Sequence, residues 1–173
     1  MRVNSLIIDD FYNNPYEVRE FALNEDFKKS IGDIIRPFAG EITWWGGEYT
    51  GSFQYTTADD RSWIHSDSYT EWAGVLYLTP DAPLTAGTGI YRHKQTGLMT
   101  WDHEKNKDYD FGPNSPIDAA KDITKWEQVD RYGNLFNRLV MYRADNFHIS
   151  LDYFGNDIND GRLFQVFFFN TEK

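Results

Sequence analysis

The segment Ser62-Trp63-Ile64-His65-Ser66-Asp67 places an imidazole and a carboxylate two positions apart, at the end of a run that favours an extended conformation. Residues i and i+2 of an extended segment point to the same face, so His65 and Asp67 can turn toward one ion. Two ligands hold a metal poorly. We expect the third to be His148, which also stands where a loop enters an extended run, in Asn146-Phe147-His148-Ile149-Ser150.

Two histidines and one carboxylate that leave coordination positions open are the ligand set of non-haem Fe(II) oxygenases. With Fe(II), the two neutral imidazoles and one carboxylate leave a net charge of about +1 on the metal centre, which favours an anionic cosubstrate. Because Asp67 is a carboxylate and not Ala or Gly, no ligand position is vacated for a halide, which argues against a halogenase.

Arg162 opens the run Arg162-Leu163-Phe164-Gln165-Val166-Phe167-Phe168-Phe169, which reads as an apolar strand. An arginine at the edge of so apolar a strand needs an anion, and its planar fork suits a carboxylate. The alternative is an exposed arginine that caps the edge of a sheet.

The composition indicates one globular domain that spans residues 1–173. With 40% hydrophobic and 17% aromatic residues, the chain is too rich in large apolar side chains to be disordered. A length of 173 residues suits a single core. The chain has no cysteine, so it has neither disulfides nor a thiolate nucleophile, and a metal site has to use His, Asp or Glu.

Charge and hydropathy limit the partners. The formal net charge is −10, and no basic run interrupts it, so nucleic acid is not expected as a partner. No apolar run is long enough to span a bilayer, and residues 1–10 lack the apolar region of a signal peptide. We therefore expect a soluble, cytoplasmic protein, in the host cytoplasm if a phage encodes it, with no membrane partner.

The pattern along the chain predicts mostly short strands. Asn14, Pro15 and Glu17 form a capping-box-like start for a helix that should run to about Glu25. Ser115 and Pro116 should open a second helix that ends at Gly133, after a polar insertion over residues 100–116. Residues 40–51 should form a loop or hairpin. Strands are expected over residues 3–8, 52–56, 62–65, 73–79, 89–92, 135–142, 147–154 and 162–170.

These elements predict a mainly β fold of the α+β type rather than a βαβ sheet. The expected core is a double-stranded β-helix, also called a jelly roll or cupin-like barrel, with an N-terminal helix and one helical insertion.

Five segments resemble, in order and spacing, the Fe(II)- and 2-oxoglutarate-dependent dioxygenases, nearest to their prolyl-hydroxylase-like branch. The similarity covers roughly residues 50–170, and the segment from Ile8-Asp9-Asp10-Phe11 to Ala22-Leu23 also looks like the start of small phage and bacterial members. The departure is at Ala86-Gly87-Thr88-Gly89, where the family often has two adjacent glycines and an acid. The five segments are residues 62–67, 75–80, 87–91, 146–150 and 161–169.

The resemblance implies a hydroxylase that uses Fe(II), 2-oxoglutarate and O2, with His65, Asp67 and His148 as iron ligands. It implies that Arg162 binds the distal carboxylate of 2-oxoglutarate. Tyr77 matches the strand tyrosine that hydrogen-bonds the same carboxylate. Tyr55 matches the tyrosine that faces the cosubstrate near the metal. For both tyrosines the alternative is a packing role, with the hydroxyl satisfied elsewhere.

Two other classes of protein fit the same residues. One is a non-catalytic jelly roll with a binding or structural role. The other is a cupin that uses the three ligands with Zn(II) or Mn(II), in which Arg162 would bind substrate. The sequence names no substrate beyond a peptide, an amino acid or another small molecule, and it leaves the oligomeric state open. His103 is expected to be a solvated loop histidine rather than a ligand for a substrate or an ion. His93 is expected to have no functional role, the alternative being an acidic substrate bound together with Arg92.

Overall fold

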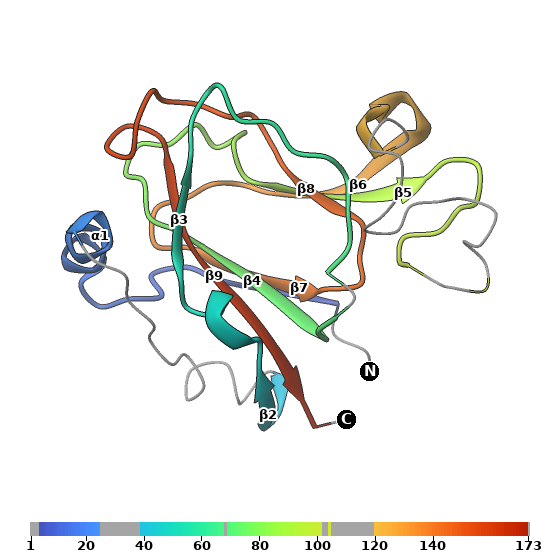
Figure 1. Cartoon of the computed structure of the whole chain (residues 1–173), viewed down its shortest axis with the longest axis horizontal. Coiled ribbons are helices and arrows are strands. Elements are labelled where there is room, and N and C mark those ends of the chain that lie inside the picture. Colours follow the sequence, from blue (N-terminus) through green and yellow to red (C-terminus); the bar gives the residue numbers. More distant parts are fainter. Residues whose placement is uncertain (1–3, 25–38, 68, 102–103, 105–119, 173) are drawn as a thin grey trace.

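Two antiparallel β-sheets face each other in the computed structural model, which describes residues 4–24, 39–67, 69–101, 104 and 120–172 (Figure 1). The helices that lie wholly within these residues are α1 (Pro15–Asn24) and two short 3-10 helices, η1 (Gly47–Tyr49) and η2 (Ile123–Lys125). The strands are β1 (Ser5–Ile8), β2 (Ile42–Trp45), β3 (Phe53–Thr56), β4 (Trp72–Tyr77), β5 (Thr88–His93), β6 (Trp126–Tyr132), β7 (Leu139–Arg143), β8 (His148–Ser150) and β9 (Arg162–Thr171).

The larger sheet has the order β1-β7-β4-β9-β2, and β3 also pairs with β9. β3 and β2 share one edge of β9, because β3 pairs with its first half, from Arg162 to Gln165, and β2 pairs with its end, from Phe169 to Thr171. The smaller sheet has the order β6-β5-β8. All named strand pairs are antiparallel, so the predicted double-stranded β-helix is confirmed as the fold class.

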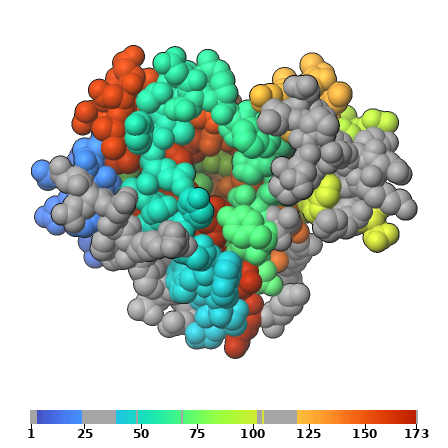
Figure 2. Space-filling model, in the orientation of Figure 1, coloured from blue at the N-terminus to red at the C-terminus, as the bar shows by residue number. Residues whose placement is uncertain are grey.

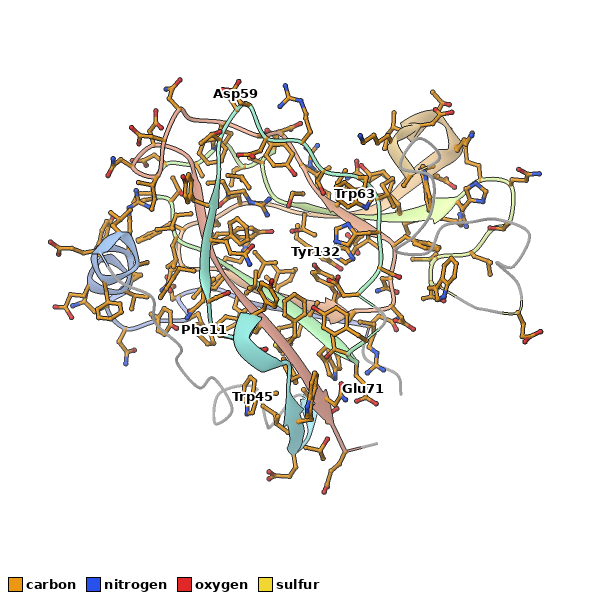
Figure 3. All side chains as sticks on the ribbon, viewed as in Figure 1. Phe11, Trp45, Asp59, Trp63, Glu71 and Tyr132 are labelled. Carbon is orange, nitrogen blue, oxygen red and sulfur yellow. The ribbon has the colours of Figure 1, made fainter. Side chains whose placement is uncertain are left out.

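Alternation along β9 separates a closed core from the interior of the barrel. Leu163, Phe167 and Phe169 point outward into a hydrophobic cluster that α1 and the residues before it cover. Arg162, Phe164, Val166 and Phe168 point the other way, between the two sheets. Figure 3 labels Phe11 on the α1 side of the larger sheet and Tyr132 between the sheets. The ten-residue β9 is therefore both a core strand and a wall of the interior.

The N-terminal helix was predicted correctly, and it is tied to the barrel. Arg19 of α1 donates from Nη1 to the carbonyl of Leu78 at 2.8 Å and from Nη2 to the carbonyl of Asn159 at 2.6 Å.

None of the helices among the described residues is long and apolar enough to cross a membrane.

The predicted second helix is wrong over its last part, because residues 126–132 form β6. Its expected start at Ser115 and Pro116, with most of the insertion and His103, lies outside the described residues. Trp126, Val129 and Tyr132 recur at a spacing that mimics one face of a helix. A bulge in the pairing with β5 leaves Val129 without a partner and shifts the register. Trp126 and Tyr132 are therefore buried on opposite faces of the smaller sheet.

Three other strand predictions need correction. The strand predicted over residues 135–142 begins only at Leu139. Residues 62–65 form no strand and make only one isolated bridge, from His65 to His148. The strand predicted over residues 147–154 is limited to His148–Ser150, because the chain turns away at Asp152, whose φ is +43°. The segment that carries the first predicted ligands is therefore held by single contacts and not by a regular ladder.

Asn137 joins the N-terminal segment to the larger sheet, and its removal should destabilise the fold. Its amide and the backbone of Tyr12 exchange two hydrogen bonds of 2.8 Å, and its own φ is +63°. We expect Asn137→Ala to lower the free energy of unfolding by about 2–4 kcal/mol, because it loses both bonds and strains the backbone. Asn137→Gly should cost less, since glycine tolerates this φ. Urea denaturation measures both, and equal stability of Asn137→Ala and the wild type would contradict the assignment.

Candidate metal centre

A pair of reciprocal backbone hydrogen bonds brings the two predicted histidine ligands together. The N–H of His65 donates to the carbonyl of His148 at 3.0 Å, and the N–H of His148 donates to the carbonyl of His65 at 2.8 Å. Their rings lie side by side, with centroids 4.4 Å apart. The N–H of Asp67 donates to the carbonyl of Ala144 at 2.7 Å, which fixes the third residue against the same loop.

Both imidazoles are oriented in the same way. Nδ1 of His65 lies 2.9 Å from the carbonyl oxygen of Trp63, and Nδ1 of His148 lies 2.9 Å from the carbonyl oxygen of Asn146. A carbonyl only accepts, so Nδ1 carries the proton in both rings. Nε2 of each ring is then the unprotonated nitrogen that can bind a metal, and the carbonyl fixes the orientation of the ring.

The potential ligand atoms of the three residues converge to within 4.8 Å of one another. Nε2 of His148 lies 3.3 Å from Oδ2 of Asp67, and Nε2 of His65 lies 3.9 Å from Oδ1 of Asp67. A first-row metal with bonds of about 2.1 Å spans neighbouring ligand atoms that lie roughly 3 Å apart. His65, Asp67 and His148 could therefore hold one such ion after a small closure.

The charge states of the three residues suit a cation. Burial would raise the pKa of Asp67, but the contact with His148 and the electrostatic interactions with both imidazoles outweigh it, so the pKa is lowered from its ordinary value. Burial and the neighbouring His148 together lower the pKa of His65 below 6.5. At neutral pH the carboxylate is ionised and His65 is neutral, as metal binding requires.

The candidate metal centre opens into a cavity of about 320 Å³ between the two sheets, a volume in the range of ligand pockets. Residues 53–67, from β3 through the following loop, arch over one side of it, and Figure 2 shows a hollow framed by these teal and green residues. The walls come from both sheets, and Tyr142, Thr88 and Ser150 line them beside the predicted residues.

Arg162 lies in this cavity as a buried cation. Its side chain is 1% exposed, and Nε and Nη1 have no hydrogen-bond partner among the described residues. Its guanidinium lies between aromatic rings, 5.4 Å from the ring centre of Tyr77 and 4.9 Å from that of Phe164. Leaving donors of a buried guanidinium unpaired is costly, so this position favours an anionic ligand over an exposed capping role.

Tyr77 lies beside Arg162, and its side chain is fully buried. Its hydroxyl and Oγ1 of Thr88 are 2.8 Å apart. Burial raises the pKa of Tyr77, so the phenol stays protonated and can donate a hydrogen bond.

Tyr55 does not reach the cavity, in contrast to its expected place near the cosubstrate. It is 51% exposed, whereas its neighbours Gln54 and Thr56 line the cavity. Alternation along β3 puts Tyr55 on the outer face, opposite Leu163 of β9. The resemblance to the dioxygenase family pointed to Tyr55, but the register of β3 on β9 decides which residue faces inward.

The sequence did not point to Tyr142, which is buried against the metal centre. Its ring is centred 4.8 Å from that of His148 and stacks on Tyr132 at an interplanar angle of 14°. It stands on β7 shortly before His148, and an inward position in an alternating strand is the signal that could have found it.

His93 is buried against Trp126, which fits a structural role.

Two exposed aromatic side chains lie near the potential metal ligands. Trp63 is 43% exposed, and its ring is centred 6.3 Å from that of His65 (Figure 3). Tyr69 is 60% exposed and contacts Phe168 at 5.5 Å between ring centres. Burial, and then the negative charge of Asp67, raise the pKa of Tyr69 to about 12. These rings offer flat apolar surface next to the potential ligands.

Comparison with known proteins shows the fold of the chain. Residues 58–169 match the model of a family described as being of unknown function, DUF6445. HygX from Streptomyces hygroscopicus with iron bound is similar at a TM-score of 0.57 and 9% identity, over 97% of this chain and 82% of HygX. HygX with nickel and 2-oxoglutarate bound is similar at a TM-score of 0.54 and 10% identity, over 97% of this chain and 83% of HygX. The chain therefore shares the fold of HygX.

A prolyl hydroxylase from Trichoplax adhaerens, in complex with a peptide fragment of hypoxia inducible factor, gives a TM-score of 0.42 at 10% identity, over 96% of this chain and 83% of the other. So low a TM-score supports no inference, and the prolyl-hydroxylase-like branch stays a prediction. No curated protein matches the sequence.

Asp67→Asn should weaken the binding of a divalent metal by about 100-fold or more, because it removes the only anionic member of the proposed ligand set. Asp60→Asn is the matched control, since Asp60 also lines the cavity but its carboxylate caps the backbone of Thr57 at 2.7 Å. Equilibrium dialysis against Mn(II) or Fe(II) under anaerobic conditions measures both variants. Equal loss in the two variants would show that only the negative charge of the cavity matters.

Proposed function

The chain belongs to the DUF6445 family, and we propose that it is a non-haem Fe(II)- and 2-oxoglutarate-dependent dioxygenase. We propose that it hydroxylates a peptide, an amino acid or another small substrate. His65, Asp67 and His148 would hold the iron, and Arg162 with Tyr77 would hold the distal carboxylate of 2-oxoglutarate.

One observation carries this proposal: a buried arginine with unpaired donors lines the same cavity as the potential metal ligands. A cupin-type hydrolase or isomerase would need the three ligands, and it would need this cation only if its own substrate were an anion. A non-catalytic jelly roll would need neither, and leaving both unpaired would only cost stability. A dicarboxylate that reaches from the metal to Arg162 accounts for both features in one ligand.

When bound, Fe(II) and 2-oxoglutarate would supply the oxidising chemistry, in which O2 is consumed, 2-oxoglutarate yields succinate and CO2, and the substrate gains a hydroxyl group. The residues of the chain provide position and charge. The carbonyl oxygens of Trp63 and Asn146 hold the Nε2 atoms of the two histidines toward the cavity. The buried cation of Arg162 offsets the charge of a dianion, and Phe164 and Phe168 line the same cavity with apolar surface.

The exposed rings of Trp63 and Tyr69 support a substrate site at the metal end of the cavity, because a substrate has to approach the metal from an open side. Their apolar faces suit a peptide or a small molecule with an apolar part. HygX was solved with iron and with 2-oxoglutarate, and the shared fold supports the same cosubstrate here.

The purified protein with Fe(II), 2-oxoglutarate and O2 should form succinate, and addition of the true substrate should raise the rate. Mass spectrometry of succinate, with a screen of peptides and amino acids, measures this outcome. Asp67→Asn should form none above the background of free iron. Metal-dependent turnover of a substrate without O2 would instead favour the cupin reading, and no turnover with any metal would favour a binding role.

Arg162→Ala should weaken the binding of 2-oxoglutarate roughly thirtyfold or more, because removing one member of a buried charge pair costs about 2–5 kcal/mol. Arg162→Lys should recover only part of this loss, since an ammonium cannot reproduce the planar fork. Anaerobic calorimetric titration of 2-oxoglutarate into the metal-loaded protein measures both.

Arg92→Ala is the matched control for Arg162, because Arg92 forms an exposed ion pair with Glu127 at 2.6 Å and does not line the cavity. Metal affinity should be the same in all of these variants. If the dissociation constant of 2-oxoglutarate were the same in Arg162→Ala and the wild type, Arg162 would not be the carboxylate anchor.

A further inference from the structure

Thr56 presents a second unpaired polar group beside Arg162. The two residues are direct partners in the antiparallel pairing of β3 with β9. Directly opposite residues of such a pair point to the same face, and both line the cavity. Oγ1 of Thr56 is buried and, like Nε and Nη1 of Arg162, has no hydrogen-bond partner among the described residues.

This coincidence needs an explanation, because buried polar groups are normally paired. A buried threonine hydroxyl usually has a hydrogen-bond partner, as Thr79 has in the carbonyl of Gly161 at 2.7 Å. Thr56 does not, although valine would fill the same space without an unpaired group. A bound ligand that accepts a hydrogen bond from this hydroxyl would explain why it is unpaired in the protein without ligand.

The chemistry of that ligand follows from the neighbours. Thr56 and Arg162 offer donors, and no ion pair among the described residues involves Arg162. A carboxylate has several lone pairs, so it can accept from the guanidinium and from a hydroxyl at the same time. The rings of Tyr77 and Phe164 hold the guanidinium in place, so the donors are oriented before the ligand binds.

We propose that Thr56 is a carboxylate-binding residue whose hydroxyl donates a hydrogen bond to the distal carboxylate of the 2-oxo acid bound by Arg162. The proposal rests on the proposed function, since it concerns the same cosubstrate. In this proposal, the residue of β3 that contacts the cosubstrate is the inward Thr56 and not the outward Tyr55. Thr56 thereby contributes to selection of a 2-oxo acid with a second carboxylate.

The test compares Thr56→Val, which removes the hydroxyl at nearly constant volume, with Thr56→Ser, which keeps it. Tyr55→Phe is the matched control, because it removes a hydroxyl from the adjacent residue on the outer face. Anaerobic calorimetry with the Mn(II)-loaded protein measures the binding of two probes. One is 2-oxoglutarate, and the other is 2-oxopentanoate, which has a methyl group where 2-oxoglutarate has its distal carboxylate.

We expect Thr56→Val to lower the affinity for 2-oxoglutarate about tenfold, which is the loss typical of a hydrogen bond to a charged group. Its affinity for 2-oxopentanoate should not change. Thr56→Ser and Tyr55→Phe should bind both probes like the wild type. Without a cosubstrate, Thr56→Val should melt no lower than the wild type, because the lost hydroxyl has no partner there.

Each other outcome separates this inference from the proposed function. If Thr56→Val bound 2-oxoglutarate like the wild type, the role of Thr56 would be refuted while the function stood. If it lost affinity for both probes equally, Thr56 would act on the shape of the cavity and not on the carboxylate, which also refutes the inference. If the wild-type protein bound no 2-oxoglutarate, the proposed function itself would fail, and the role of Thr56 would fail with it.

Discussion

The site depends on one contact, the reciprocal backbone hydrogen bonds between His65 and His148. No ladder continues from this bridge on the His65 side, so the two residues are held by a single antiparallel pair. Because opposite residues of such a pair place their side chains on one face, the bridge sets the imidazoles beside each other. The carbonyls two residues before each histidine then fix which nitrogen faces the cavity.

The larger sheet provides the other half of the site through the alternation of β9. The outward residues Leu163, Phe167 and Phe169 are locked in the core under α1, so β9 cannot slip by one residue without burying Arg162 in that core. The hydrophobic effect on one face of the strand thus determines the position of the charge on the other. A cavity with a cation at a fixed place follows from packing that lies outside the cavity.

The unpaired donors that face the cavity destabilise the folded protein when no ligand is bound. Arg162 and Thr56 leave polar atoms unpaired in the interior, where such atoms each cost about 1–3 kcal/mol. Proteins retain such groups where a ligand pairs them, and they compensate elsewhere with a well-packed core. Here Leu76, Leu139 and Phe167 on the opposite face of the same sheet are completely buried and supply that stability.

The sequence alone determined the fold class, the N-terminal helix, most strands and the residues that converge, because alternation and ligand chemistry are local properties. The helix predicted up to Gly133 was wrong over residues 126–132, because the prediction rested on start and stop signals, whereas pairing with β5 makes these residues a strand. The family resemblance pointed to Tyr55, whereas the register of β3 on β9, which the spacing along the chain does not determine, turns Thr56 inward. Tertiary structure decided which side chains face the cavity, because a shift of one residue in register exchanges the two faces of a strand.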